Sequence, residues 1–221
     1  MRKFYAVLFR VVVAAIPGAW LRAALTRLFP CRVIQSESGP YLSRWTLRKR
    51  GDGGHDYLHF FHCGDKDRDL HDHPWSGRGV VLAWGYREER RFPMTAVDDI
   101  GRFTKLGEQV LLRSTWVFSP SYAEAEEAAR ATGYAVLARD YRFGDETEVS
   151  PGTFHRVDLL RPDRGCWTYI STSARSKSWG FWNRCTGALT PWGEYLAHRG
   201  IPTDGDTRPV ARLAGSRGKQ P

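Results

Sequence analysis

Short β-prone segments that follow one another at close spacing constrain the fold of this chain more than any other feature of its sequence. In the second half of the chain, four such segments, rich in aromatic and β-branched residues, are separated by turns of Gly, Pro and Asp; they are residues 134–143, 147–149, 154–160 and 166–172. Regularly spaced short strands with turn residues between them favour a β-sandwich or β-barrel over a parallel sheet covered by helices.

The first half of the chain continues the strand pattern. Residues 41–50 and 56–63 are predicted to form a hairpin around a glycine-rich turn. Further strands are expected on either side of Gly85. Residues 121–132 have the alanine and glutamate content of a short helix, which we expect as an insertion on the β scaffold. A second short helix, over residues 191–196, should pack on the barrel.

The two ends of the chain differ in character from this middle part. Arg10 and the Pro17-Gly18 pair interrupt the apolar start, and Val11 to Ile16 is too short to cross a bilayer, which takes about 20 apolar residues. We expect residues 1–35 to form an amphipathic helical extension that docks on protein; interfacial membrane contact and a signal or anchor segment are the alternatives. The barrel domain should span residues 36–200, and residues 201–221 should be a disordered basic tail.

Charge and cysteine usage limit the classes of partner and compartment. The formal net charge is +9, and much of the excess lies at the two ends of the chain. We interpret it as solvated surface, with nucleic acid or an anionic membrane as alternative partners. Four cysteines without C-x-x-C spacing exclude a zinc knuckle and a disulfide-rich scaffold. Free thiols and a cytoplasmic location are the expectation.

Three histidines are the candidates for chemistry. His71 and His73 lie two positions apart in the run Asp-Leu-His-Asp-His-Pro-Trp, so they point the same way if this segment is an extended strand. His155, which follows a Pro-Gly turn later in the chain, can supply a third imidazole. Three nitrogen ligands leave coordination positions open, as a catalytic metal site requires. The alternative is that His71 and His73 are surface residues beside nearby aspartates.

These motifs carry a resemblance. The run from Asp69 to Gly85, followed by Gly144 to His155, resembles the two sequence motifs of the cupin superfamily: His-x-His and Gly, then Gly, Pro-x-Gly and His. The likeness covers residues 41–172. It implies an all-β fold, the cupin-type double-stranded β-helix (jelly-roll) barrel with short N-terminal and C-terminal helices, and a divalent metal on His71, His73 and His155. The His-Asp-His-Pro-Trp, Phe-His-Arg-Val-Asp-Leu and Trp-Gly-Phe-Trp segments are similar to phage and bacterial cupin proteins of unassigned function.

One position departs from the cupin pattern. Where many cupins have a metal-binding Glu, this chain has Gly77 or Arg78, depending on the spacing used. A three-histidine site without a carboxylate resembles that of the thiol dioxygenases, in which Fe(II) is bound by three imidazoles and a nearby Arg binds the substrate carboxylate. Arg78 is therefore the candidate catalytic residue, because a guanidinium pairs with a carboxylate in bidentate fashion. The alternative is that Arg78 lies in a turn and faces solvent.

Two functions from different classes follow. The first is a non-haem Fe(II)-dependent oxygenase acting on a small or anionic substrate, with Fe(II) favoured over Zn, Ni or Mn. The second is a non-catalytic module in which a metal orders the barrel while the surface binds a protein or nucleic acid. A metal-dependent isomerase or lyase lies between them. We also expect a homodimer, since many cupins pair through their sheet edges.

Overall fold

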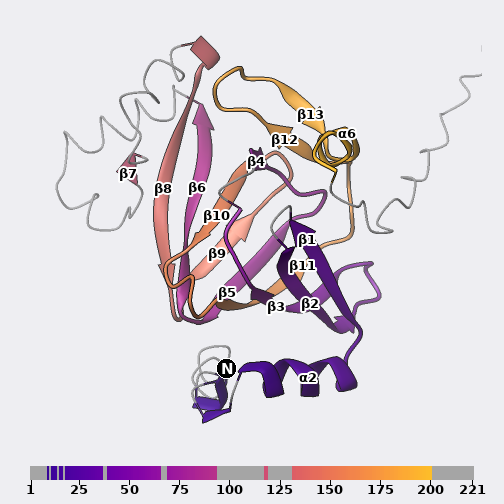
Figure 1. Cartoon of the computed structure of the whole chain (residues 1–221). Coiled ribbons are helices and arrows are strands. Elements are labelled where there is room, and N and C mark those ends of the chain that lie inside the picture. Colours follow the sequence, from indigo (N-terminus) through magenta and orange to yellow (C-terminus); the bar gives the residue numbers. More distant parts are fainter. Residues whose placement is uncertain are drawn as a thin grey trace, which may run out of the picture.

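The computed structural model describes residues 9, 11–13, 15–16, 18–36, 39–65, 69–93, 117–118 and 131–200 of the chain. Within these residues the architecture is two antiparallel sheets that curl toward each other (Figure 1). One sheet has the strand order β1-β2-β3-β11-β5-β9, and the other has the order β13-β12-β4-β10-β6-β8-β7. The strands are β1 (Cys31–Ser36), β2 (Gly39–Lys49), β3 (His55–Phe61), β4 (Leu70–His71), β5 (Gly77–Ala83), β6 (Gly85–Pro93), β7 (Val117–Phe118), β8 (Tyr134–Arg142), β9 (Glu146–Val149), β10 (His155–Leu159), β11 (Cys166–Thr172), β12 (Gly180–Trp182) and β13 (Leu189–Pro191).

The strand order is that of a jelly roll. Eight core strands divide between the sheets so that β3, β11, β5 and β9 face β4, β10, β6 and β8. Strands adjacent in one sheet therefore come from distant parts of the sequence; β11, for example, pairs with both β3 and β5. The fold is the predicted cupin-type double-stranded β-helix. The predicted hairpin is also confirmed, since β2 and β3 pair antiparallel.

A sharp bend carries the chain from one sheet to the other between β5 and β6. Trp84 has φ 66° and Gly85 has φ 138°. A Cβ atom on Gly85 would lie 2.4 Å from the backbone oxygen of Tyr141, so this close approach requires glycine. The turn-prone glycine in the sequence thus marks the point at which the chain changes sheets.

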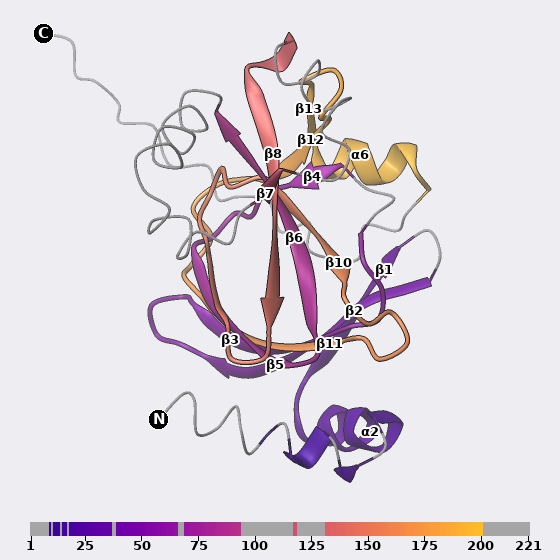
Figure 2. The same cartoon turned by 90° about the vertical axis from the view of Figure 1, so that its left-hand side faces the viewer.

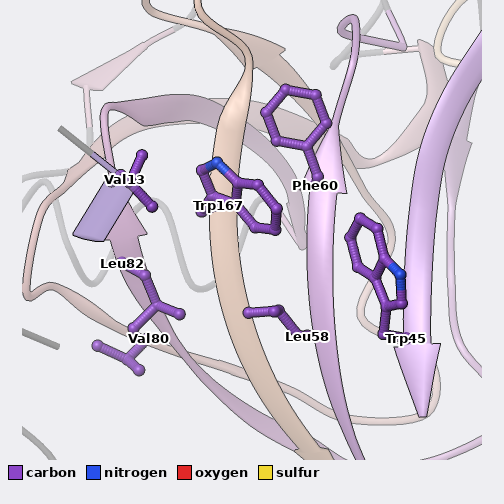
Figure 3. Packing of buried hydrophobic residues seen from close by; sticks show 8 residues of the cluster. Val13, Trp45, Leu58, Phe60, Val80, Leu82 and Trp167 are labelled. Carbon is purple, nitrogen blue, oxygen red and sulfur yellow. The ribbon is translucent and has the colours of Figure 1, made fainter. Parts of the chain in front are cut away.

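Hydrophobic clusters on both faces of the strands result from the alternation of side chains along them. Inside the barrel, Val81, Tyr86, Tyr141, Val157, Leu159 and Cys166 bring both sheets together. On the outer face of the first sheet, a second cluster comprises Val13, Trp45, Leu58, Phe60, Val80, Leu82, Ala83 and Trp167 (Figure 3). The rings of Trp45 and Trp167 stack there with centroids 5.5 Å apart. The outer cluster is covered by the N-terminal segment, which contains α2 (Gly18–Leu28) (Figure 2).

The terminal segments contain the short helices that the sequence predicts. Helix α2 lies within the expected extension over residues 1–35, but that range also contains β1, which extends the first sheet by pairing with β2. The short C-terminal helix is present as α6 (Trp192–His198). The expected helical insertion at 121–132 falls largely, and the expected tail at 201–221 entirely, outside the described residues. Among the helices of the described part, none has the length and apolar character needed to cross a membrane.

Candidate metal centre

Two strands and one loop bring the three histidines together inside the barrel. His71 ends β4, and His155 begins β10 directly opposite it in the antiparallel pair. His73 lies two residues beyond the end of β4, and its Nε2 is 2.8 Å from the Nε2 of His155. One ligand atom from each residue lies within 4.8 Å of the others. The sequence analysis expected a strand through His73; the strand is shorter, yet the imidazoles still converge.

A buried aspartate holds the loop that carries His73. Asp72 is only 1% exposed. Its carboxylate accepts hydrogen bonds from the backbone N–H groups of Gly152 (3.1 Å) and Gly180 (3.0 Å) and pairs with Lys177. Asp72 therefore links the loop that carries His73 to the turn that precedes His155 and to β12. These contacts help to hold together segments that are far apart in the sequence.

A carboxylate orients His155. Glu88, on β6, is 1% exposed and contacts the Nδ1 of His155 through Oε1. Arg90, opposite His155 in the sheet, donates to both oxygens of Glu88 at 2.8 and 3.0 Å. Burial by itself raises the pKa of Glu88, but His155 and Arg90 outweigh it and lower that pKa overall. An ionised Glu88 keeps the Nδ1 of His155 protonated and its Nε2 free to bind a metal.

A second buried carboxylate lies beside His71. Asp65, 1% exposed, has its Oδ2 3.5 Å from the Nδ1 of His71. The same side chain accepts hydrogen bonds from the backbone N–H of Val157 and from the Tyr41 hydroxyl. Two of the three candidate ligands therefore have an anionic partner on the ring nitrogen that faces away from the centre, an arrangement typical of histidine metal ligands.

His73 has a different environment. Its ring stacks on Trp75 with centroids 4.2 Å apart. Burial lowers the pKa of His73 well below its usual range, and the neighbouring His155, His71, Arg44 and His59 lower it further. A neutral imidazole is the form that binds a metal. The indole of Trp75 thus forms one wall of the site.

Arg78 is not brought to the histidines. Its side chain is 70% exposed and pairs with Glu148 at 3.4 Å. Along β5, Arg78 shares its face with Val80 and Leu82, which belong to the outer cluster, so it points out of the barrel. Gly77 faces inward, but a Cβ there would lie 2.9 Å from the Trp75 ring. Neither residue therefore takes the place of the glutamate that many cupins have.

Among the described residues, Arg90 and Arg44 are cations that face this region. Arg44, on β2, lies directly opposite His59 and donates from Nε to the Nε2 of His59 at 3.1 Å. Burial, and then Arg44, lowers the pKa of His59 well below its usual range. The sequence did not single out Arg44, Arg90 or Glu88 as candidates. In the unbroken charged run of β6 nothing in the pattern distinguishes the inward side chains from the outward ones.

No family model matches the chain, and no curated protein matches it. Among solved structures it is similar to the crystal structure of FeII HppE, with 7% identity and a TM-score of 0.40 over 65% of this chain and 56% of that one. It is also similar to recombinant oxalate oxidase in complex with glycolate, with 11% identity and a TM-score of 0.39 over 67% and 59%. It is also similar to the Lactobacillus farciminis oxalate decarboxylase formate complex, with 15% identity and a TM-score of 0.39 over 77% of this chain and 36% of that one.

This chain therefore spans less than two thirds of the length of each of these three proteins. The fold assignment itself rests on the order of the eight core strands in the two sheets. On that scaffold, His71, His73 and His155 form a group of three nitrogen donors that could hold one metal ion, backed by two buried carboxylates.

Proposed function

We propose that the chain is a metal-dependent enzyme, a non-haem Fe(II) oxygenase that acts on a small anionic substrate. The observation that carries this proposal is the convergence of His71, His73 and His155 within the barrel, with ligand atoms within 4.8 Å of one another. A set of three nitrogen donors leaves several coordination positions for substrate and a second reactant, whereas a structural zinc site is closed by four ligands.

The donor set fits a divalent ion. Imidazole nitrogen suits Fe(II), Zn, Ni and Cu, and no thiolate that would select for a softer metal belongs to the group. Asp65 and Glu88 add negative charge behind two of the rings, which strengthens the rings as donors to a cation. When bound, Fe(II) would supply one-electron chemistry toward dioxygen together with open positions for substrate; Zn, Ni and Mn are the alternatives.

The position of Arg44 is the reason for proposing an anionic substrate. Arg44 donates to His59, the residue opposite it in the first sheet. Trp45 and Phe60, the next residues along the two strands, belong to the outer cluster, so Arg44 and His59 point into the barrel. We assign to Arg44 the carboxylate-binding role that the sequence analysis gave to Arg78. In this arrangement the guanidinium would bind and orient the carboxylate of a substrate beside the histidines. Trp75 would exclude water from the adjoining side.

Metal analysis tests the first step. Protein purified without added metal, and then reconstituted with Fe(II), should bind about one ion per chain, and His71→Ala and His155→Ala should lose it. His198→Ala, an exposed histidine at the end of α6, is the matched control and should bind as the wild type does. Metal retained by both site variants would refute the proposed centre.

Oxygen uptake tests the second step. Iron-loaded protein should consume dioxygen above the buffer rate with at least one member of a panel of carboxylate-bearing thiols and 2-oxo acids. Arg44→Met should raise KM for that substrate by about tenfold or more while leaving the metal content unchanged. Metal binding without oxygen uptake on any member would reject the oxygenase and leave an isomerase or lyase reaction to be assayed.

A further inference from the structure

The helix α2 is apolar on two faces. On the inner face, Leu21 and Leu25 pack against the outer hydrophobic cluster of the first sheet, beside Val13. Arg22 also turns inward, and its guanidinium lies 4.7 Å from the centroid of the Phe60 ring. The contacts that hold α2 to the barrel are thus made by one side of the helix.

The other face of the N-terminal segment exposes large apolar side chains. Trp20 is 75% exposed and Leu28 is 74% exposed. They lie eight positions apart with Ala24 between them, so the three form one stripe along the helix. Val11 (60%) and Ile16 (40%), which precede α2 in the chain, are also exposed. Large apolar side chains that are exposed in one stripe commonly mark an interaction surface, which indicates that this stripe has a partner.

The charge of the same segment is of one sign. Residues 1–36 contain the basic residues Arg2, Lys3, Arg10, Arg22, Arg27 and Arg32 and no Asp or Glu, the first acidic residue being Glu37. The segment therefore accounts for six of the chain's nine net positive charges. Arg27, in the last turn of α2, is exposed next to Leu28.

We propose that this surface, formed by Trp20, Ala24, Arg27 and Leu28, docks the protein on an anionic lipid bilayer. An exposed apolar stripe with a Trp and flanking basic residues is what an interfacial helix presents to a membrane. A second copy of the chain would bring two segments of the same strong positive charge together. Nucleic acid would match the charge but would gain little from exposed Trp and Leu side chains.

Docking in this orientation leaves the metal centre accessible. Leu21 and Leu25 face the first sheet, whereas Trp20 and Leu28 are exposed. The strands β4 and β10, which carry His71 and His155, belong to the second sheet, on the far side of the first sheet from α2 (Figure 2). The barrel would therefore stand on the bilayer with its candidate site away from the lipid. This inference does not depend on the proposed oxygenase activity.

Flotation with vesicles tests the proposal. The full chain should bind vesicles of phosphatidylcholine with about 30% phosphatidylserine, bind vesicles of phosphatidylcholine alone at least about tenfold more weakly, and lose binding as salt is added. The double variant Trp20→Ala/Leu28→Ala should lower the partition coefficient by about tenfold or more, and Arg27→Glu by about fivefold or more.

Two controls make the outcome decisive. Leu189→Ala removes another apolar side chain, 63% exposed on β13, and should leave partitioning unchanged. His71→Ala should also bind vesicles normally, so failure of the metal site and failure of docking are separable. No binding to the anionic vesicles at low salt would overturn the proposal. So would a dimer in sedimentation that the Trp20→Ala/Leu28→Ala variant abolishes while vesicle binding stays the same.

Discussion

Glu88 provides the sharpest test of how the barrel prepares its metal centre. The carboxylate is 1% exposed, contacts the Nδ1 of His155 and accepts two hydrogen bonds from Arg90. Glu88→Gln keeps the size and an acceptor but removes the charge, whereas Glu88→Leu removes both. Loss of such an orienting partner weakens metal affinity by about 10- to 100-fold, which corresponds to about 1.4 to 2.8 kcal/mol. We expect the loss of metal affinity to lie at the lower end of this range for Glu88→Gln and at the upper end for Glu88→Leu.

The same substitutions should also lower stability in the absence of metal. Arg90 is a largely buried cation, with 14% of its side chain exposed, and it loses its carboxylate partner in either variant. Removal of one partner of a buried ion pair costs about 3 to 5 kcal/mol in the free energy of unfolding. Urea denaturation of the metal-free protein measures this cost, and a Co(II) absorbance titration of the folded variants measures metal affinity separately.

A matched control lies one residue along the strand. Glu89 points to the outside of the barrel and pairs with Arg156 at 2.7 Å, so Glu89→Gln removes a carboxylate of the same kind from the same strand. It should leave metal affinity unchanged. In a His155→Ala background, Glu88→Gln should have no further effect on metal affinity. Equal affinities of the Glu88→Gln, Glu88→Leu and Glu89→Gln variants would refute the positioning role of Glu88.

Three further predictions concern other parts of the barrel. Asp72→Ala removes the buried acceptor of two backbone N–H groups, so the free energy of unfolding should fall by about 3 kcal/mol in denaturant titration; an unchanged value would contradict the linking role. Burial lowers the pKa of His59 in the folded state, so the metal-free protein should lose stability as the pH falls below about 6.5, with up to about 1.4 kcal/mol per pH unit from this one group. His59→Asn should reduce that slope, and an identical pH profile would refute the assignment. Burial raises the pKa of Cys166 to about 12, so iodoacetamide at pH 8 should label the exposed Cys185 and spare Cys166 in the native protein, as mass spectrometry of tryptic peptides would reveal.

Local patterns in the sequence were sufficient to predict most strands and the hairpin. Alternation of side chains and the spacing of Gly, Pro and Asp are properties of neighbouring residues, so they can be read without knowledge of the partner strand. The His-x-His pair and His155 stood out for the same reason, and the structure brings all three together. The short β4 shows the limit of this reasoning: the strand ends at His71, and a loop held by Asp72 directs His73.

Only the tertiary structure decided which charged residues face the histidines. Arg78 was the candidate because it occupies the position at which many cupins have a metal-binding Glu, but the alternation of β5 places it on the outer face with Val80 and Leu82. Arg44 lies on β2 and Glu88 on β6, and the sequence gives no sign that either is near His155. Each faces inward because of the way its strand pairs within its sheet. Sequence determines which residues alternate along a strand, whereas the pairing of distant strands determines which of the two faces becomes the interior.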